Sequence, residues 1–151
     1  MANESRVLIV EDNDVLRVML FTILRHQPLA VDTATNAVEA IERTMTCDYA
    51  LILLDADLPD DEAAEFLRLF ETEHPDAPTF IVAVRSTESK PLLHSRVGAV
   101  LSKPLEIDTL AELVRECAAV VPPPEESQMQ CPPAESEIRA RMDRSGSFYS
   151  N

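Results

Sequence analysis

The stretch Tyr49-Ala-Leu-Ile-Leu-Leu-Asp-Ala-Asp-Leu-Pro59 decides the fold that this sequence predicts. Its first part, residues 49–54, is continuously apolar, which is typical of a short strand that is buried on both faces. The apolar run ends at Asp55, so an acidic side chain follows directly after a buried strand. We therefore expect segments on either side of this strand to form the layers that cover it.

Strand and helix patterns alternate on both sides of residues 49–54. Apolar runs predict further strands. Apolar residues at helical spacing, with start signals, predict two helices, one after the Asp12-Asn13-Asp14 segment and one after the Asn36 and Glu39 capping box. The same spacing predicts helices over residues 62–73 and 107–120. Pro91 lies where a fourth helix is expected, so that helix should be short or displaced. The predicted strands are residues 7–10, 29–33, 49–54, 80–84 and 99–101. Strict alternation favours an α/β fold with a doubly wound, five-stranded parallel sheet in the order 2-1-3-4-5.

Length, charge and cysteine usage narrow the class of protein. The chain has 151 residues, enough for one domain, and a formal net charge of −14 from 27 acidic and 13 basic residues. Such a charge repels a nucleic-acid backbone, so we expect no direct nucleic-acid binding. The three cysteines, Cys47, Cys117 and Cys131, are too widely spaced for a disulfide framework and are expected to be reduced. No leader or membrane segment is indicated, which favours a cytoplasmic protein.

Composition changes after Val121. Residues 122–151 are rich in proline and poor in apolar side chains, so we expect a domain over residues 1–121 followed by a flexible tail. Residues 136–142 are compatible with a transient helix, and the end of the tail with either a docking peptide or no role. The tail is too short for an output domain.

Charged residues follow the predicted strands at the edge where ligands bind in open parallel sheets. Glu11 and Asp12 follow the first strand, Asp55 ends the third, Arg85 and Ser86 follow the fourth, and Lys103 follows the fifth. Clustered carboxylates repel one another, and a divalent cation such as Mg²⁺ relieves that repulsion. A carboxylate can also accept a phosphoryl group when the charge of that group is neutralised. Each residue also has a structural interpretation: Asp12 as a helix cap, Asp55 as a turn residue, and Lys103 as a solvated cation.

Three segments resemble the response-regulator receiver family: residues 8–13 (Leu-Ile-Val-Glu-Asp-Asn), residues 53–59 (Leu-Leu-Asp-Ala-Asp-Leu-Pro) and residues 98–105 (Gly-Ala-Val-Leu-Ser-Lys-Pro-Leu). The resemblance covers residues 6 to about 121. It implies the flavodoxin-like receiver fold and a role in a two-component phosphorelay, as a phosphoryl-accepting signalling domain rather than a multiple-turnover enzyme. By this resemblance Asp55 takes a phosphoryl group from a histidine kinase or histidine phosphotransferase. Asp12 and Asp55 bind Mg²⁺ with help from Glu11, the backbone carbonyl of Asp57 is a further ligand, and Lys103 pairs with the phosphate.

The sequence departs from the family pattern in several places, including both residues of the usual phosphorylation switch. Arg85 stands where a hydroxyl residue usually follows the phosphoryl group, and Val100 where a coupled aromatic is usual. Ser86 would have to shift register to replace the hydroxyl. Arg85 either contacts phosphate or pairs with Asp55 and blocks the pocket, and the sequence leaves both open.

Three functions are compatible with these patterns. The first is a phosphorylatable receiver that signals through its fourth-helix to fifth-helix face, or acts as a phosphate relay or sink, with an unknown downstream protein and possible homodimers. The second is a degenerate receiver that binds a partner without phosphorylation. The third treats Asp55-Ala-Asp57 as the acid pair of a haloacid-dehalogenase-like phosphatase, although that pair normally follows the first strand of a longer chain.

Overall fold

The computed structural model describes residues 5–88, 92, 94–120 and 131–148. These residues contain the strands β1 (Ser5–Val10), β2 (Leu29–Ala34), β3 (Leu51–Asp55), β4 (Phe80–Arg85) and β5 (Val97–Ser102). The helices are α1 (Asp14–Leu24), α2 (Ala37–Thr46), α3 (Glu62–Glu73), α4 (Ile107–Val120) and α5 (Glu135–Phe148), with a 3₁₀ turn at Pro59–Asp61. Within the described residues, no helix is long and apolar enough to cross a membrane.

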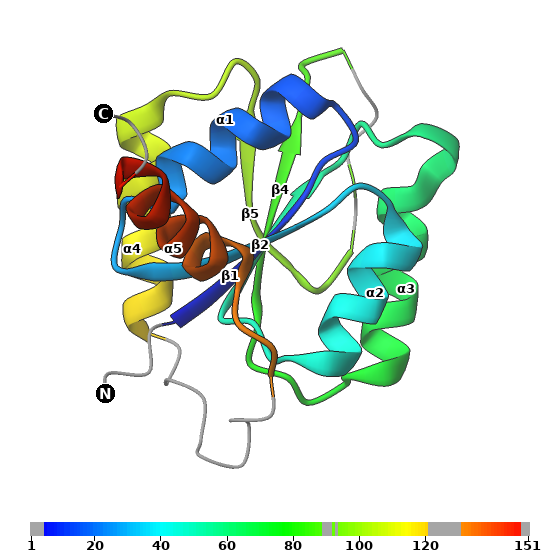
Figure 1. The fold of residues 1–151 in the computed structure, drawn as a ribbon. Helices are drawn as coiled ribbons and strands as arrows, with labels where there is room; N and C mark the ends of the chain where they lie inside the picture. The colour runs from blue at the N-terminus through cyan, green and yellow to red at the C-terminus, as the bar shows by residue number, and fades with distance from the viewer. Residues whose placement is uncertain (1–4, 89–91, 93, 121–130, 149–151) are drawn as a thin grey trace.

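The five strands form one parallel sheet in the order β2-β1-β3-β4-β5, which confirms the predicted topology (Figure 1). Strand β3 lies at the centre, between β1 and β4. Helices α1 and α4 supply one core layer, and α2 and α3 supply the other, on the two sides of the sheet. All five strands therefore end at the same edge of the sheet, and the loops that follow them meet there.

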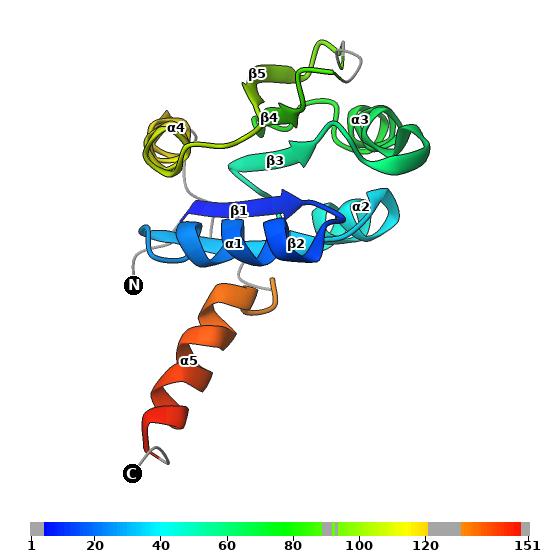
Figure 2. The ribbon, with the colours of Figure 1, turned by 90° about the horizontal axis from the view of Figure 1, so that it is seen from above.

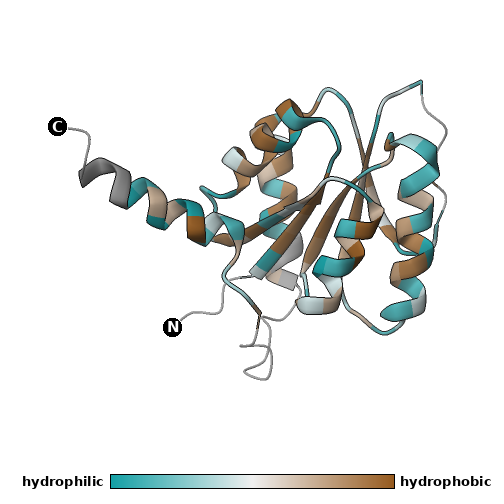
Figure 3. Cartoon of the chain, turned by 45° about the vertical axis from the view of Figure 1, so that its right-hand side comes forward, coloured by the Kyte–Doolittle hydropathy of each residue, from teal (hydrophilic) through white to brown (hydrophobic). Residues whose placement is uncertain are grey.

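Successive residues of the central strand point into opposite core layers. In β3, Leu51 and Leu53 pack with residues of α1 and α4, whereas Ile52 and Leu54 pack with residues of α2 and α3. All four are buried, and burying a side chain of this size contributes about 1.5–3 kcal/mol. Figure 3 shows the apolar strands enclosed between the helices. This double burial explains why residues 51–54 are apolar without alternation.

The segment between β4 and β5 departs most from the alternating pattern. Its described residues, 86–88, 92 and 94–96, form no helix, and Pro91, on which the sequence prediction rested, lies outside the described residues. Strand β5 is longer than predicted, and alternate residues of it are exposed, with Val100 53% exposed. Residues 89–91 and 93 lie outside the described residues, so the predicted fourth helix and a signalling face that includes it stay predictions.

Helix α5 lies where the sequence predicted part of a flexible tail. Residues 121–130 lie outside the described residues, and the predicted boundary at residue 121 stays a prediction. The Val31 N–H of edge strand β2 donates to Ser136 Oγ at 2.8 Å, and the Thr33 N–H donates to Glu135 Oε1 at 2.9 Å. Edge strands expose such unpaired backbone groups, so polar side chains can order this segment without much apolar burial. Composition alone therefore underestimated the order of residues 131–148. Figure 2 shows α5 extending from β2 away from the sheet.

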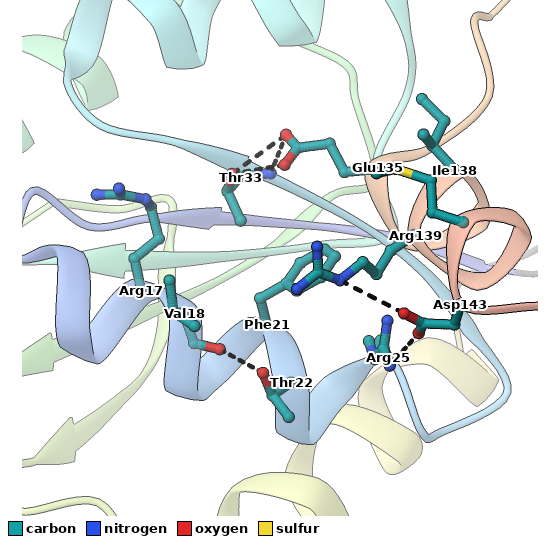
Figure 4. Close-up of a pocket in the computed structure, with 11 residues that line it drawn as sticks. Arg17, Val18, Phe21, Thr22, Arg25, Thr33, Glu135, Ile138, Arg139 and Asp143 are labelled. Carbon is teal, nitrogen blue, oxygen red and sulfur yellow. Dashed lines mark hydrogen bonds and ion pairs between the residues drawn. The ribbon is translucent and has the colours of Figure 1, made fainter. Parts of the chain in front are cut away.

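A cavity of about 620 Å³ separates α5 from α1 (Figure 4). Val18 and Phe21 of α1 line it together with Ile138 and Met142 of α5. Arg25 of α1 is paired with Asp143 of α5 at 2.7 Å. None of the acidic residues that follow β1 and β3 lines this cavity. It is therefore separate from the residues that the sequence singled out for chemistry.

Candidate functional site

Three carboxyl groups converge at the carboxyl edge of the sheet. Glu11 and Asp12 follow β1, and Asp55 ends β3, which pairs directly with β1. One carboxylate oxygen from each of the three residues lies within 4.8 Å of the others. Glu11 and Asp55 are 2% and 3% exposed, whereas Asp12 is exposed. The sequence predicted this meeting, because neighbouring parallel strands end side by side.

Asp12 is free for a role other than helix capping. The N-cap of α1 is Asn13, whose Oδ1 accepts a hydrogen bond from the Leu16 N–H at 2.9 Å. The alternative interpretation of Asp12 as the helix cap is therefore wrong. Its exposed carboxyl group stands at the open side of a cluster whose other two members are buried.

The surroundings of Glu11 disfavour the charged form of its carboxyl group. Burial, together with a hydrogen bond and charge repulsion from Asp55, raises the pKa of Glu11 to about 8. Glu11 therefore holds its proton to higher pH than an isolated carboxyl group, and this proton relieves the repulsion between the carboxyl groups. A divalent cation would relieve it in the same way. Three hard oxygen ligands that leave room for water and phosphate oxygens suit Mg²⁺, so the donor set fits this ion.

Lys103 lies opposite the three acids, just after β5. Its Nζ is 3.0 Å from Asp55 Oδ1 and 3.2 Å from Asp57 Oδ2. Burial lowers the pKa of Lys103, but hydrogen bonds to Asp55 and Asp57 outweigh that effect and raise the pKa above its usual value. The Lys103 N–H donates to the Arg85 carbonyl at 2.9 Å, which fixes the start of the side chain against β4. Lys103 is thus a paired cation within the site, not a solvated one.

The Asp57 carboxylate has partners that the sequence did not indicate. Besides Lys103, its Oδ2 accepts a hydrogen bond from the Ser86 N–H at 2.9 Å. The Asp57 N–H donates to Asp55 Oδ1 at 2.9 Å. In the receiver interpretation the sequence assigned Asp57 a backbone carbonyl ligand, and its carboxylate is not part of the three-residue acidic cluster. Side-chain direction after a strand end depends on the turn that follows, which spacing does not reveal.

Arg85 and Ser86 lie at the same edge as Asp55. Arg85 is the last residue of β4 and is half-buried, and its neighbour Val84 is in register with Asp55. Ser86 begins the following loop and takes part in the site through its backbone N–H. Whether Arg85 contacts phosphate or blocks the pocket stays a prediction.

The fold and this edge together define an α/β domain of the receiver class. A model of the response regulator receiver domain matches residues 7–115. The chain therefore belongs to the response regulator receiver family, the receivers of two-component signalling. The family assignment does not favour the degenerate-receiver alternative.

Curated relatives and solved structures agree with this assignment. The chain is 32% identical over 112 residues to the transcriptional regulatory protein PmrA of Pectobacterium parmentieri, covering 73% of this chain and 50% of that protein. It is 30% identical to the response regulator protein FleR of Pseudomonas aeruginosa, covering 95% of this chain and 32% of that protein. The chain thus spans half the length of PmrA and a third of FleR.

Two solved structures show the same fold. The signal receiver domain of a putative LuxO repressor protein from Vibrio parahaemolyticus has a TM-score of 0.68 and 24% identity, covering 77% of this chain and 91% of that one. The response regulator protein TrrA from Thermotoga maritima, in complex with Mg²⁺-BeF, has a TM-score of 0.65 and 24% identity, covering 75% of this chain and 98% of that one.

Proposed function

We propose that Asp55 accepts a phosphoryl group from a histidine kinase or a histidine phosphotransferase, within a two-component phosphorelay. The observation that carries this proposal is the convergence of Glu11, Asp12 and Asp55 within 4.8 Å, with Lys103 Nζ 3.0 Å from Asp55 Oδ1. An acidic cluster without a cation opposite could hold a metal but would repel a phosphoryl group. The paired amine makes the edge suitable for both.

The roles follow from the positions of the side chains. Mg²⁺ at the three carboxylates, when bound, would neutralise the phosphoryl oxygens. The Asp55 carboxylate is the nucleophile: its bond to phosphorus forms as the bond between phosphorus and the donor histidine nitrogen breaks, and the imidazole leaves. Lys103 is placed to pair with a phosphoryl oxygen, and the Asp57 N–H orients the Asp55 carboxylate through Oδ1. The Asp57 backbone carbonyl is the further metal ligand that we propose.

The downstream role stays open between two predictions. The domain signals through its fourth-helix to fifth-helix face, or it acts as a phosphate relay or sink. Homodimers and the identity of the output partner stay predictions. A degenerate receiver would show tight partner binding that is unaffected by substitution of Asp55 and by removal of metal.

Phosphoryl incorporation should depend on Mg²⁺. We expect the wild-type chain, incubated with Mg²⁺ and phosphoramidate, to gain the mass of one phosphoryl group, and borohydride reduction followed by peptide mapping to locate it at Asp55. An excess of EDTA should abolish the gain, because the three carboxylates then repel the donor. No mass gain with Mg²⁺ present, or an equal gain in EDTA, would contradict the proposal.

Arg85→Thr should slow phosphoryl incorporation by about fivefold, because a guanidinium at this strand end offsets the phosphoryl charge. The initial rate with phosphoramidate and Mg²⁺ is the measurement. Arg68→Thr, which removes an exposed arginine of α3, is the matched control and should leave the rate unchanged. A faster rate in Arg85→Thr would show instead that Arg85 blocks the pocket.

A further inference from the structure

One oxygen of Asp57 is held by two donors at the candidate site. Asp57 Oδ2 lies 3.2 Å from Lys103 Nζ and accepts the Ser86 N–H at 2.9 Å. The same Lys103 Nζ lies 3.0 Å from Asp55 Oδ1. Asp57 is therefore a second anion that shares the amine of the proposed phosphoryl acceptor. It also connects that amine to the first residue of the loop after β4.

These two donors are the kind that an anionic phosphoryl oxygen requires. A phosphoryl group on Asp55 would bring its oxygens next to Lys103, which already contacts the Asp55 carboxylate. Charge-assisted bonds from an ammonium and a backbone N–H are the strong contacts to such oxygens. The Asp57 carboxylate accepts the Ser86 N–H and takes one of the three donors of the Lys103 ammonium. Because it also repels another anion, it competes with the phosphoryl group for the same position.

We propose that the Asp57 carboxylate occupies the position of a phosphoryl oxygen in the resting domain, and that it must release Lys103 and Ser86 when Asp55 is phosphorylated. This inference rests on the proposed function and adds a positioning residue that regulates the same site. Release of Ser86 would remove the hydrogen bond between Asp57 and the first residue of the loop after β4. Through that hydrogen bond, Asp57 would couple the state of Asp55 to this loop.

An internal competitor lowers apparent affinity without changing the saturated state. Only the fraction of molecules in which Asp57 has left can bind a phosphoryl group or its mimic, so the apparent dissociation constant equals the intrinsic constant divided by that fraction. In Asp57→Asn, the amide keeps the shape and an oxygen for the Ser86 N–H but loses the charge that holds Lys103. We expect the concentration of beryllium fluoride needed for half-saturation, at fixed Mg²⁺, to fall by about tenfold.

The experiment compares three proteins: wild type, Asp57→Asn and Asp60→Asn. Asp60 is exposed and lies in the adjacent 3₁₀ turn, so its substitution makes the same change in net charge. Isothermal titration calorimetry measures half-saturation by beryllium fluoride, and the phosphoramidate mass assay is run in parallel. We expect the half-saturating concentration of beryllium fluoride to fall in Asp57→Asn. In Asp60→Asn it should change by less than about twofold, because salt screens the charge of an exposed residue. The binding stoichiometry should be equal in all three proteins. Asp57→Ala provides a second variant, and thermal unfolding confirms that each one folds.

The outcomes separate this inference from the proposed function. The role of Asp57 would be overturned if both Asp57 variants bound beryllium fluoride no more tightly than the wild type. It would also be overturned if Asp60→Asn increased the affinity as much as Asp57→Asn does. In either case, binding of beryllium fluoride by the wild type would still support phosphoryl acceptance. If no protein binds beryllium fluoride and none gains a phosphoryl group at Asp55, the proposed function fails and this inference fails with it.

Discussion

Asp55→Asn should gain no phosphoryl group under conditions in which the wild type is fully modified. The amide of asparagine lacks the negative charge that the nucleophile needs. The substitution also removes one of the three carboxylates of the metal site. The side chain is nearly the same size, and its remaining oxygen can still accept the Lys103 and Asp57 N–H bonds that hold Asp55 Oδ1. The substitution therefore removes chemistry without opening a cavity. Intact-mass measurement after incubation with phosphoramidate and Mg²⁺ is the readout.

The matched control for this change is Asp76→Asn. Asp76 is exposed and precedes β4, so it lies at the opposite edge of the sheet from Asp55. The Asp76→Asn variant should gain a phosphoryl group on Asp55 at the wild-type rate. A full mass gain in Asp55→Asn would place the acceptor elsewhere, and an equal loss in Asp76→Asn would show that net charge, not the acceptor carboxylate, controls the reaction.

Asp32→Ala should destabilise the domain by about 3–5 kcal/mol, which is the cost of breaking a buried ion pair on one side. Asp32 lies in β2 and is 1% exposed. Its Oδ2 accepts from Arg6 Nε at 2.8 Å and from the Tyr49 hydroxyl at 2.7 Å, and its Oδ1 accepts from the Glu135 N–H at 2.9 Å. Alanine would leave a largely buried guanidinium and a buried hydroxyl without this acceptor.

Urea unfolding followed by circular dichroism measures this loss of free energy of unfolding. Asp32→Asn should cost less, because the amide oxygen still accepts hydrogen bonds although the charge is gone. Asp76→Ala, at an exposed loop position, should change stability by less than about 0.5 kcal/mol. A loss in Asp32→Ala no larger than that of the control would mean that the Asp32 network contributes nothing to the folded state. Because the Glu135 N–H is one of the donors, the substitution should also loosen α5.

Local patterns predicted most of the domain. Helices at residues 62–73 and 107–120 have the predicted bounds, and Asn36 caps α2, with its Oδ1 accepting from the Glu39 N–H at 2.9 Å. The Glu39 carboxylate reaches the Thr35 N–H, one residue earlier than a capping box requires. These features depend on residues close together in the sequence, so periodicity and capping residues identify them directly.

Contacts between distant segments were not predictable in this way. The Arg6, Asp32 and Tyr49 network, the Ser136 bond to β2, and the bond from the Ser86 N–H to Asp57 each join separate elements. The sequence around Asp32, an acidic residue in a buried strand, did not indicate its partners, and neither did the sequence of the polar tail around Ser136. Their energy depends on which side chains the register of the sheet and the path of the chain bring together.

By itself, the amino-acid sequence determined a five-stranded parallel sheet whose carboxyl edge carries Glu11, Asp12, Asp55 and Lys103. It could do so because the local apolar pattern identifies the buried strands, and short connections between the elements limit the possible strand orders. Only the tertiary structure decided that Asp57 shares Lys103 with Asp55, and that Glu135 and Ser136 at the start of α5 bond to β2. Those two results depend on hydrogen-bond partners far apart in the chain, and such partners are selected by three-dimensional packing.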